Sequence, residues 1–216
     1  MILSSCGTWS NLAKGTAIGS GGGAAVGAAA GALLGKDAKS AAIGSAIGAI
    51  VGAGAGAIIG DKMDKKAEEL KALEGAKVET VTDANNLTSV KVTFESGILF
   101  ATNKSNLSDV AKKSLKEFAA TMADMPETDI TIWGHTDNTG SDAVNERLSL
   151  ERANSVKSFL TDAGIAAERM TTEGKSYSMP VASNETKDGR AQNRRVEVYI
   201  TANQAMIAEA EAEAAK

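Results

Sequence analysis

The fold is decided by the stretch DITIWGHTDNTG at residues 129–140. Its first four residues alternate between polar and apolar side chains and a tryptophan follows, which predicts a strand over residues 129–133. A loop bounded by Gly134 and Gly140 follows. A long helix is then expected over residues 142–163, with Gly164 as the glycine that ends it. The stretch and its continuation therefore predict a strand, a loop and a helix in succession.

Strands and helices are also predicted on both sides of this stretch. Two alternating runs joined by the turn residues 83–86 indicate a β-hairpin. Ser108 is suited to cap an amphipathic helix, which Pro126 stops. The predicted buried face of that helix consists of Val110, Leu115, Phe118, Ala119 and Met122. The predicted strands are residues 78–82, 89–94, 129–133, 169–173 and 196–200, with a long polar loop before the last. Two main helices packed on a mixed sheet make an α+β fold.

Three motifs follow one another in the second half of the chain. They are GHTDNTG at residues 134–140, NERLSLERA at 145–153 and GRAQNRRV at 189–196. Together they resemble the OmpA-like C-terminal domain, a family that binds peptidoglycan and includes the peptidoglycan-associated lipoproteins. The resemblance extends over roughly residues 92–201, with the motifs in the family's order. It implies a mixed β-sheet packed against two main helices and non-covalent binding to the cell wall.

The motif residues suggest a ligand by their charges. Asp137 lies between a predicted strand end and a helix start, where loops present side chains to ligands. Asn145 and Arg152 are two helical turns and about 10 Å apart on one face, with Ser149 between them. A carboxylate and a guanidinium that face one groove suit a zwitterion. The carboxylate accepts from an ammonium, and the guanidinium holds a carboxylate through two parallel hydrogen bonds.

The family resemblance implies which zwitterion this is. The side chain of meso-diaminopimelate, in the stem peptide of Gram-negative cell walls, ends in an amine and a carboxylate on one carbon. The resemblance assigns these two groups to Asp137 and Arg152. Other positions that match the family's site are Asn103, Thr139, Asn145 and Arg194, with Thr139 acting through its backbone. A lysine-type stem peptide lacks the terminal carboxylate, so selectivity against it is expected.

Asp137 and Arg152 also have plainer interpretations. Asp137 can instead cap the turn that follows it. Arg152 can instead extend along the helix surface and pair with Glu151 or Asp142. Both alternatives are open from the sequence.

The two adjacent arginines and the single histidine are expected to differ in role. Only one of Arg194 and Arg195 can face inward on a strand, because neighbouring side chains alternate. One of them is therefore expected to form a structural salt bridge, for example to the Asp137 loop. His135 has no second nitrogen or thiol ligand near it in the sequence, so a structural role is expected. No metal or other cofactor is predicted.

Residues 14–61 carry two glycine ladders with a four-residue period, from Gly15 to Gly35 and from Gly44 to Gly60. Residues four apart share a helix face, and a stripe of bare backbone lets two helices approach closely, as in membrane packing. Each uncharged stretch has about 20 residues, enough to cross a bilayer core as a helix. A helical hairpin is predicted, resembling the glycine zipper of bacterial outer-membrane lipoproteins. The alternative is a flexible linker rich in glycine and alanine.

Cys6 is the single cysteine, so no internal disulfide is possible. It ends the tetrapeptide LSSC, which resembles the lipobox of bacterial lipoproteins, and lipidation at Cys6 is expected. A lipoprotein signal needs an apolar run of about 7–15 residues before this point. Here only Met1 and Ile2 precede the motif, which indicates a start assigned too late or a trimmed sequence. A chance tetrapeptide is the alternative.

These features divide the chain into five predicted parts. They are a signal remnant with a linker (1–13), the glycine-zipper hairpin (14–61), a charged helical linker (62–77), the OmpA-like domain (78–202) and a tail rich in alanine and glutamate (203–216). The linker is expected to be a solvated helix and the tail a frayed surface helix.

Charge and residue content limit the possible functions. A net charge of −4 and a pI near 5.2 give no basic surface for nucleic acid. One histidine, one cysteine and no evident carboxylate pair argue against an enzyme that cuts peptidoglycan. The predicted function is therefore a tether between peptidoglycan and the outer membrane, on its periplasmic face. The alternative is an oligomeric pore or membrane-remodelling hairpin, in which the wall domain serves as the tether.

Overall fold

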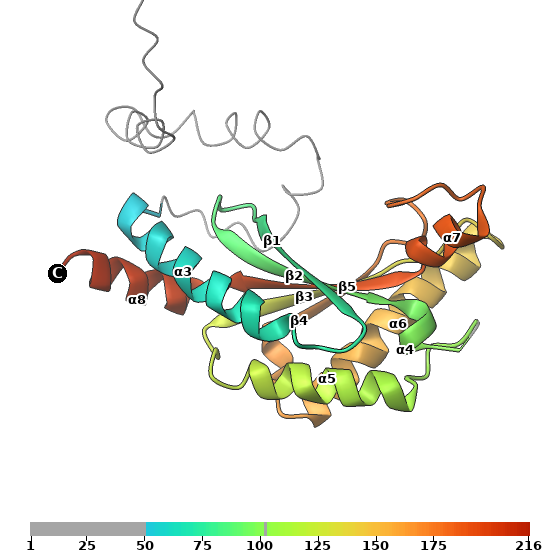
Figure 1. Cartoon of the computed structure of the whole chain (residues 1–216), viewed down its shortest axis with the longest axis horizontal. Helices are drawn as coiled ribbons and strands as arrows, with labels where there is room; N and C mark the ends of the chain where they lie inside the picture. The colour runs from blue at the N-terminus through green and yellow to red at the C-terminus, as the bar shows by residue number, and fades with distance from the viewer. Residues whose placement is uncertain (1–50, 102) are drawn as a thin grey trace, which may run out of the picture. The chain divides into compact units, whose positions relative to one another are not determined.

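The computed structural model describes residues 51–101 and 103–216, in which five strands form one sheet in the order β1-β2-β5-β3-β4 (Figure 1). The strands are β1 (Ala76–Thr82), β2 (Thr88–Glu95), β3 (Thr128–Gly134), β4 (Met170–Gly174) and β5 (Arg195–Ala202). Neighbouring strands are antiparallel except β3 and β4, which are parallel. The predicted hairpin, the mixed sheet and the α+β class are confirmed.

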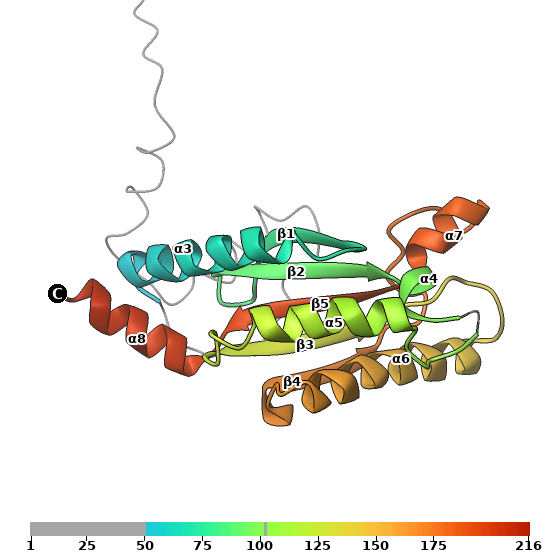
Figure 2. The same ribbon diagram turned by 60° about the horizontal axis from the view of Figure 1, so that its bottom comes forward.

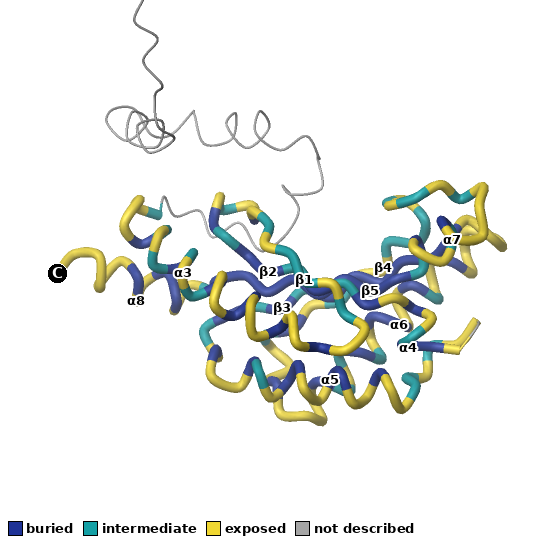
Figure 3. Tube along the Cα trace, in the orientation of Figure 1, coloured by how far each residue is buried: buried dark blue, intermediate teal, exposed yellow. Residues whose placement is uncertain are grey.

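The central strand β5 has two buried faces (Figure 3). Its Val196, Val198 and Ile200 belong to the main hydrophobic core. The alternate residues point to the opposite side of the sheet because side chains alternate along a strand. These residues are Arg195, Glu197, Tyr199 and Thr201, and they are buried as well. One strand thus separates an apolar core from a polar cluster.

Helices cover the apolar face of the sheet (Figure 2). The principal ones are α5 (Asp109–Thr121) and α6 (Asp142–Asp162). α5 begins as predicted, because the Ser108 hydroxyl accepts a hydrogen bond from the Ala111 N–H at 3.0 Å. Val110 is 54% exposed, so its predicted place on the buried face is wrong.

The helix α3 (Ala53–Leu70) differs from the solvated linker expected at residues 62–77. Its Ile59, Met63 and Leu70 are buried in the main core, while most of its charged residues face solvent. The last glycine of the second ladder, Gly60, lies in this helix, where a Cβ would be 3.5 Å from the Thr88 hydroxyl of β2. α3 is therefore part of the folded domain and not a separate connector.

The tail also differs from expectation. Residues 204–214 form α8 (Gln204–Ala214), which packs against α3. The Asn203 side chain caps it by accepting from the Ala205 and Met206 N–H groups. Met206 and Ile207 are buried, so the helix is docked and not frayed.

Three short helices complete this part of the domain, and the last of them interrupts the expected long polar loop before β5. They are α4 (Ser96–Leu99), the 3-10 helix η2 (Ala167–Arg169) and α7 (Lys187–Asn193), whose first turn is capped by Thr186. Cys6 and the glycine ladders before residue 51 lie outside the described residues. Among the helices of residues 51–101 and 103–216, none has the length and apolar character that a membrane crossing requires.

Candidate binding site

Two glycines bring α6 against the ends of β3 and β4. A Cβ at Gly134 would lie 1.9 Å from the backbone oxygen of Ser149, and a Cβ at Gly174 would lie 2.8 Å from the nitrogen of Leu150. No side chain fits at such distances from backbone atoms. Asn145 lies about one turn before Ser149 on α6, and Arg152 lies about one turn after it. The close approach therefore places both residues beside the end of β3.

The loop after β3 is tied to two neighbouring segments. The His135 N–H donates to the Arg195 carbonyl at 2.9 Å, which continues the pairing of β3 with β5. The Thr136 N–H donates to the Ser176 carbonyl at 2.9 Å. Asp137 follows these two anchors and is 5% exposed. Its position is thus fixed by the backbone hydrogen bonds of the two residues before it.

The Asp137 carboxylate already has three donors within the protein. Its Oδ1 accepts from the Thr139 N–H at 2.9 Å and from the Thr139 hydroxyl. Its Oδ2 accepts from Nη1 of Arg194 at 2.5 Å. Burial acts to raise the pKa of Asp137, but the bonds from Thr139 and Arg194 outweigh it and hold the pKa below its ordinary value. Asp137 therefore both caps its own turn and forms an ion pair.

Arg152 lies in the opposite situation. It is 3% exposed, its Nε donates to the Lys104 carbonyl at 3.2 Å, and its guanidinium stacks on Phe100 at 5.2 Å from the ring centroid. Its Nη1 is buried and bonds to no described residue, and it forms no ion pair with Glu151 or Asp142. Burial, and next the charge of Arg194, lower the pKa of Arg152, and Asp137 partly opposes this.

The structure brings most of the predicted site residues together. The Asn145 side chain donates to the Thr139 carbonyl at 3.0 Å, so it holds the Asp137 loop. Hydrogen bonds thus connect Asp137, Thr139, Asn145 and Arg194. Asn103 is exposed, with a φ of 56°, and makes no hydrogen bond to this group among the described residues. It directly precedes Lys104, whose carbonyl holds Arg152.

Sequence reasoning missed two residues of the site, Phe100 and Lys104. Phe100 occurs in an apolar run and looked like an ordinary core residue. Lys104 contributes only its backbone carbonyl, 48 residues away from Arg152 in the chain. No side-chain pattern reports such a contact.

Arg195 and His135 lie in a separate buried charge cluster, consisting of His135, Arg195, Glu197 and Tyr199. Arg195 Nε donates to Glu197 at 2.8 Å, and the Tyr199 hydroxyl donates to the same carboxylate at 2.7 Å. His135 Nε2 lies 3.3 Å from it. Burial acts to raise the pKa of Glu197, but His135 and Arg195 outweigh it and lower the pKa strongly. Here the guanidinium and the carboxylate are paired with each other, as expected for structural residues, although both ring nitrogens of His135 lack a hydrogen-bond partner among the described residues.

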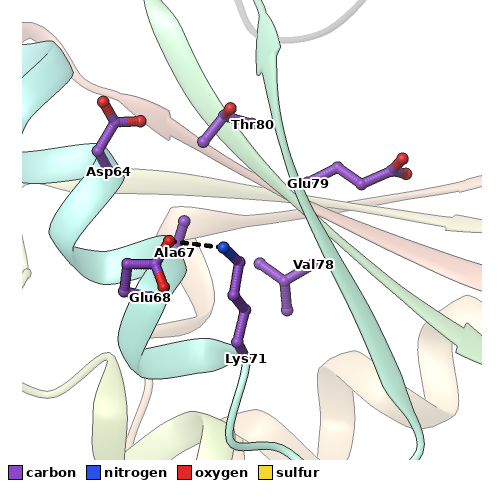
Figure 4. Close-up of a pocket in the computed structure, with 7 residues that line it drawn as sticks. All are labelled: Asp64, Ala67, Glu68, Lys71, Val78, Glu79 and Thr80. Atoms are coloured by element: carbon purple, nitrogen blue, oxygen red, sulfur yellow. Dashed lines mark hydrogen bonds and ion pairs between the residues drawn. The ribbon is translucent and has the colours of Figure 1, made fainter.

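Two surface hollows lie away from the motif residues. One lies between α3 and β1 (Figure 4) and is lined by Asp64, Ala67, Glu68, Lys71, Val78, Glu79 and Thr80. Lys71, one of its charged residues, is bound to Glu68 at 2.5 Å. The other lies over β2 and contains the pairs Lys91–Glu79 and Arg195–Glu197. Neither contains Asp137 or Arg152, so neither competes with the motif as the candidate site.

Comparison with known proteins confirms both resemblances seen in the sequence. Residues 99–194 match the OmpA family, and residues 1–64 match the YMGG-like Gly-zipper family. The chain is 44% identical over 119 residues to outer membrane protein Omp38 of Acinetobacter baumannii, which covers 55% of this chain and 33% of that protein. It is 44% identical over 105 residues to the putative lipoprotein YfiB of Escherichia coli, covering 48% and 66%. The chain thus spans between a third and two thirds of these relatives.

Solved structures agree with the fold. The cell wall anchor of the T6SS from Pseudomonas aeruginosa superimposes with a TM-score of 0.55 and 29% identity, covering 65% of this chain and 97% of that one. A MotB-like protein from Desulfovibrio vulgaris gives a TM-score of 0.59 at 24% identity and covers 68% and 96%. The second likeness is one of fold alone.

Proposed function

We propose that this chain, which carries an OmpA-family domain and a YMGG-like glycine zipper, binds peptidoglycan non-covalently and tethers the outer membrane to the cell wall. The ligand group is the side chain of meso-diaminopimelate. One observation carries the proposal: Arg152 is a buried guanidinium with an unpaired Nη1, close to the Asp137 carboxylate. A buried donor without a partner costs about 1–3 kcal/mol, and an incoming carboxylate removes that cost.

The charges of the site favour a zwitterion over a simple anion. Arg152 offers a donor to a carboxylate, and Asp137 offers a carboxylate to an ammonium. Diaminopimelate carries both groups on its terminal carbon, at the short separation that one small site requires. A lysine side chain has the ammonium only, so it leaves Arg152 without a partner. This supports selectivity for diaminopimelate-type cell walls.

The tethering role draws on the N-terminal part of the chain. Lipidation at Cys6 and the glycine ladders provide the attachment to the outer membrane, and the domain faces the periplasm because peptidoglycan lies there. The names of the relatives, an outer membrane protein and a lipoprotein, support this placement. The role is binding and not catalysis, since the single histidine is engaged with Glu197 and the single cysteine lies in the lipidation motif.

Co-sedimentation of the full chain with diaminopimelate-type sacculi tests the proposal. The parent is compared with Asp137→Ala, with Arg152→Ala and with the double variant, in detergent and beside a sample without sacculi. Arg147→Ala is the matched control, because Arg147 lies on α6 with an exposed side chain that pairs with Glu151 at 3.5 Å.

The parent and Arg147→Ala are expected to pellet with the sacculi, and the double variant to stay soluble. Sacculi of the lysine type are expected to retain less of the parent. If the double variant pellets like the parent, the assignment of the site is wrong. A parent that remains soluble beside diaminopimelate-type sacculi contradicts the function itself.

A further inference from the structure

Asp137 and Arg152 are not equally ready for a ligand. The two oxygens of Asp137 together accept three hydrogen bonds from Thr139 and Arg194. A carboxylate offers about four acceptor positions, so one remains, on the oxygen that Arg194 already holds. Arg152, by contrast, has a buried Nη1 that bonds to nothing in the described part of the chain. A ligand carboxylate therefore meets a free donor, whereas a ligand ammonium meets an oxygen that Arg194 already pairs with.

Arg194 is the cation at that acceptor. Its Nη1 lies 2.5 Å from Oδ2 of Asp137, and its side chain is 39% exposed. We propose that Arg194 occupies, in the free protein, the place that the ligand's ammonium takes, so that binding exchanges one cation for another at Asp137. This inference rests on the proposed function, and it makes Arg194 a residue that limits the affinity for the ligand.

The backbone of Arg194 allows its side chain to leave. Its carbonyl accepts from the Ser96 N–H at 2.9 Å, and its own N–H donates to the Arg190 carbonyl at 3.1 Å. The main chain is thus held at both groups, independently of Asp137. A half-exposed arginine can turn its guanidinium into water while its stem stays in place. The exchange needs no movement of β5 or α7.

The charges of the site favour this exchange once a zwitterion arrives. In the free protein the one carboxylate of Asp137 lies near two guanidinium groups, those of Arg152 and Arg194. The positive charge of Arg194 makes the charged form of Arg152 less favourable. With Arg194 withdrawn, one carboxylate and one guanidinium face the ammonium and the carboxylate of the ligand. In a water-poor site such one-to-one pairing is the stable arrangement. The ammonium therefore adds less affinity in the parent than it does when Arg194 is absent.

Two synthetic tripeptides separate the contributions, measured by calorimetric titration of the full chain. One ends in meso-diaminopimelate, and the other ends in 2-aminopimelate, which keeps the terminal carboxylate but lacks the second amine. The proteins are the parent, Arg194→Ala and Arg194→Gln. Lys187→Ala is the control, because it removes one exposed positive charge from the same segment.

The exchange predicts that both Arg194 variants bind the diaminopimelate peptide about fivefold more tightly than the parent, which is the size of one half-exposed ion pair. Their affinity for the 2-aminopimelate peptide is not expected to rise, and Lys187→Ala is expected to match the parent. If both Arg194 variants bind the diaminopimelate peptide equally or more weakly than a parent that binds it, the inference is wrong and the proposed function stands. If the parent binds neither peptide, the proposed function fails and takes the inference with it.

Discussion

The adjacent residues Arg194 and Arg195 belong to two regions with opposite electrostatics. Arg195 lies in the buried charge cluster, where its guanidinium donates to Glu197 and to two backbone carbonyls. Arg194 lies in the proposed binding site, where it pairs with Asp137 and remains 39% exposed. The strand start turns one side chain to each side. Two identical residues thus enter different environments one position apart.

The two regions differ in whether their buried guanidinium groups have partners. In the charge cluster, the carboxylate of Glu197 is held by Arg195, Tyr199 and the neighbouring His135. In the proposed binding site, Arg152 is as deeply buried, but its Nη1 has no partner among the described residues. A buried guanidinium that is paired with a carboxylate stabilises the fold, whereas a buried guanidinium nitrogen without a partner gains its hydrogen bond only when a ligand binds.

Arg195→Ala is expected to give the largest effect on the structural side. It leaves Glu197 buried without its guanidinium, which costs about 3–5 kcal/mol of unfolding free energy. Denaturant unfolding monitored by circular dichroism measures the loss. Arg147→Ala, on the exposed face of α6, is expected to change stability by about 0.5 kcal/mol or less. A loss below about 1 kcal/mol for Arg195→Ala would show that the cluster does not depend on this ion pair.

Gly134→Ala is expected to lower both the stability of the domain and its binding to sacculi. The new Cβ would lie 1.9 Å from the Ser149 carbonyl, so α6 must move away from β3. We expect a loss of about 3 kcal/mol, together with weaker sedimentation with sacculi. Gly97→Ala is the control, because a Cβ there meets nothing within 4 Å. Unchanged binding by a destabilised Gly134→Ala would mean that the approach of α6 does not position Arg152.

Arg152→Met is expected to affect binding and leave stability nearly unchanged. Methionine keeps the contact with Phe100 but removes the donors for a carboxylate, which lowers affinity for the diaminopimelate peptide by about 10- to 100-fold. The unfolding free energy should stay within about 1 kcal/mol, because among the described residues the guanidinium makes no ion pair and loses one hydrogen bond, to the Lys104 carbonyl. Titration and unfolding of the same sample test both. A loss of stability comparable to that of Arg195→Ala would place Arg152 among the structural charges.

The charge cluster is also expected to give a two-step dependence of stability on pH. Burial lowers the pKa of His135 in the fold, so its contribution is complete above about 6.5 and declines as pH falls below that value. The pKa of Glu197 is also lowered, so its contribution is complete above about 4.5 and is lost at more acidic pH. Thermal unfolding from pH 8 to pH 3 measures both. His135→Gln should remove the first decline and keep the second.

Local sequence determined much of the domain. The Ser108 cap is formed within a few residues, and so is the end of α6 at Gly164, whose φ is +103°. The hairpin of β1 and β2 likewise follows from alternation and a turn. These features depend on hydrogen bonds and periodicities inside one segment, so the sequence displays them directly. The identities of Asp137, Thr139, Asn145 and Arg194 as neighbours also followed from motifs in the family's order.

Only the tertiary structure decided the rest. The charged residues of α3 made it look solvated in the sequence. Its few apolar residues are buried only because the helix packs on the sheet. The contacts of Arg152 with Phe100 and with the Lys104 carbonyl join segments about 50 residues apart. The side of the sheet on which Arg195 lies depends on the register of β5 against β2, and Arg194 is placed by the end of α7 just before that strand. The sequence by itself specified which charges the domain carries, and the packing of distant segments decided which of them were left unpaired.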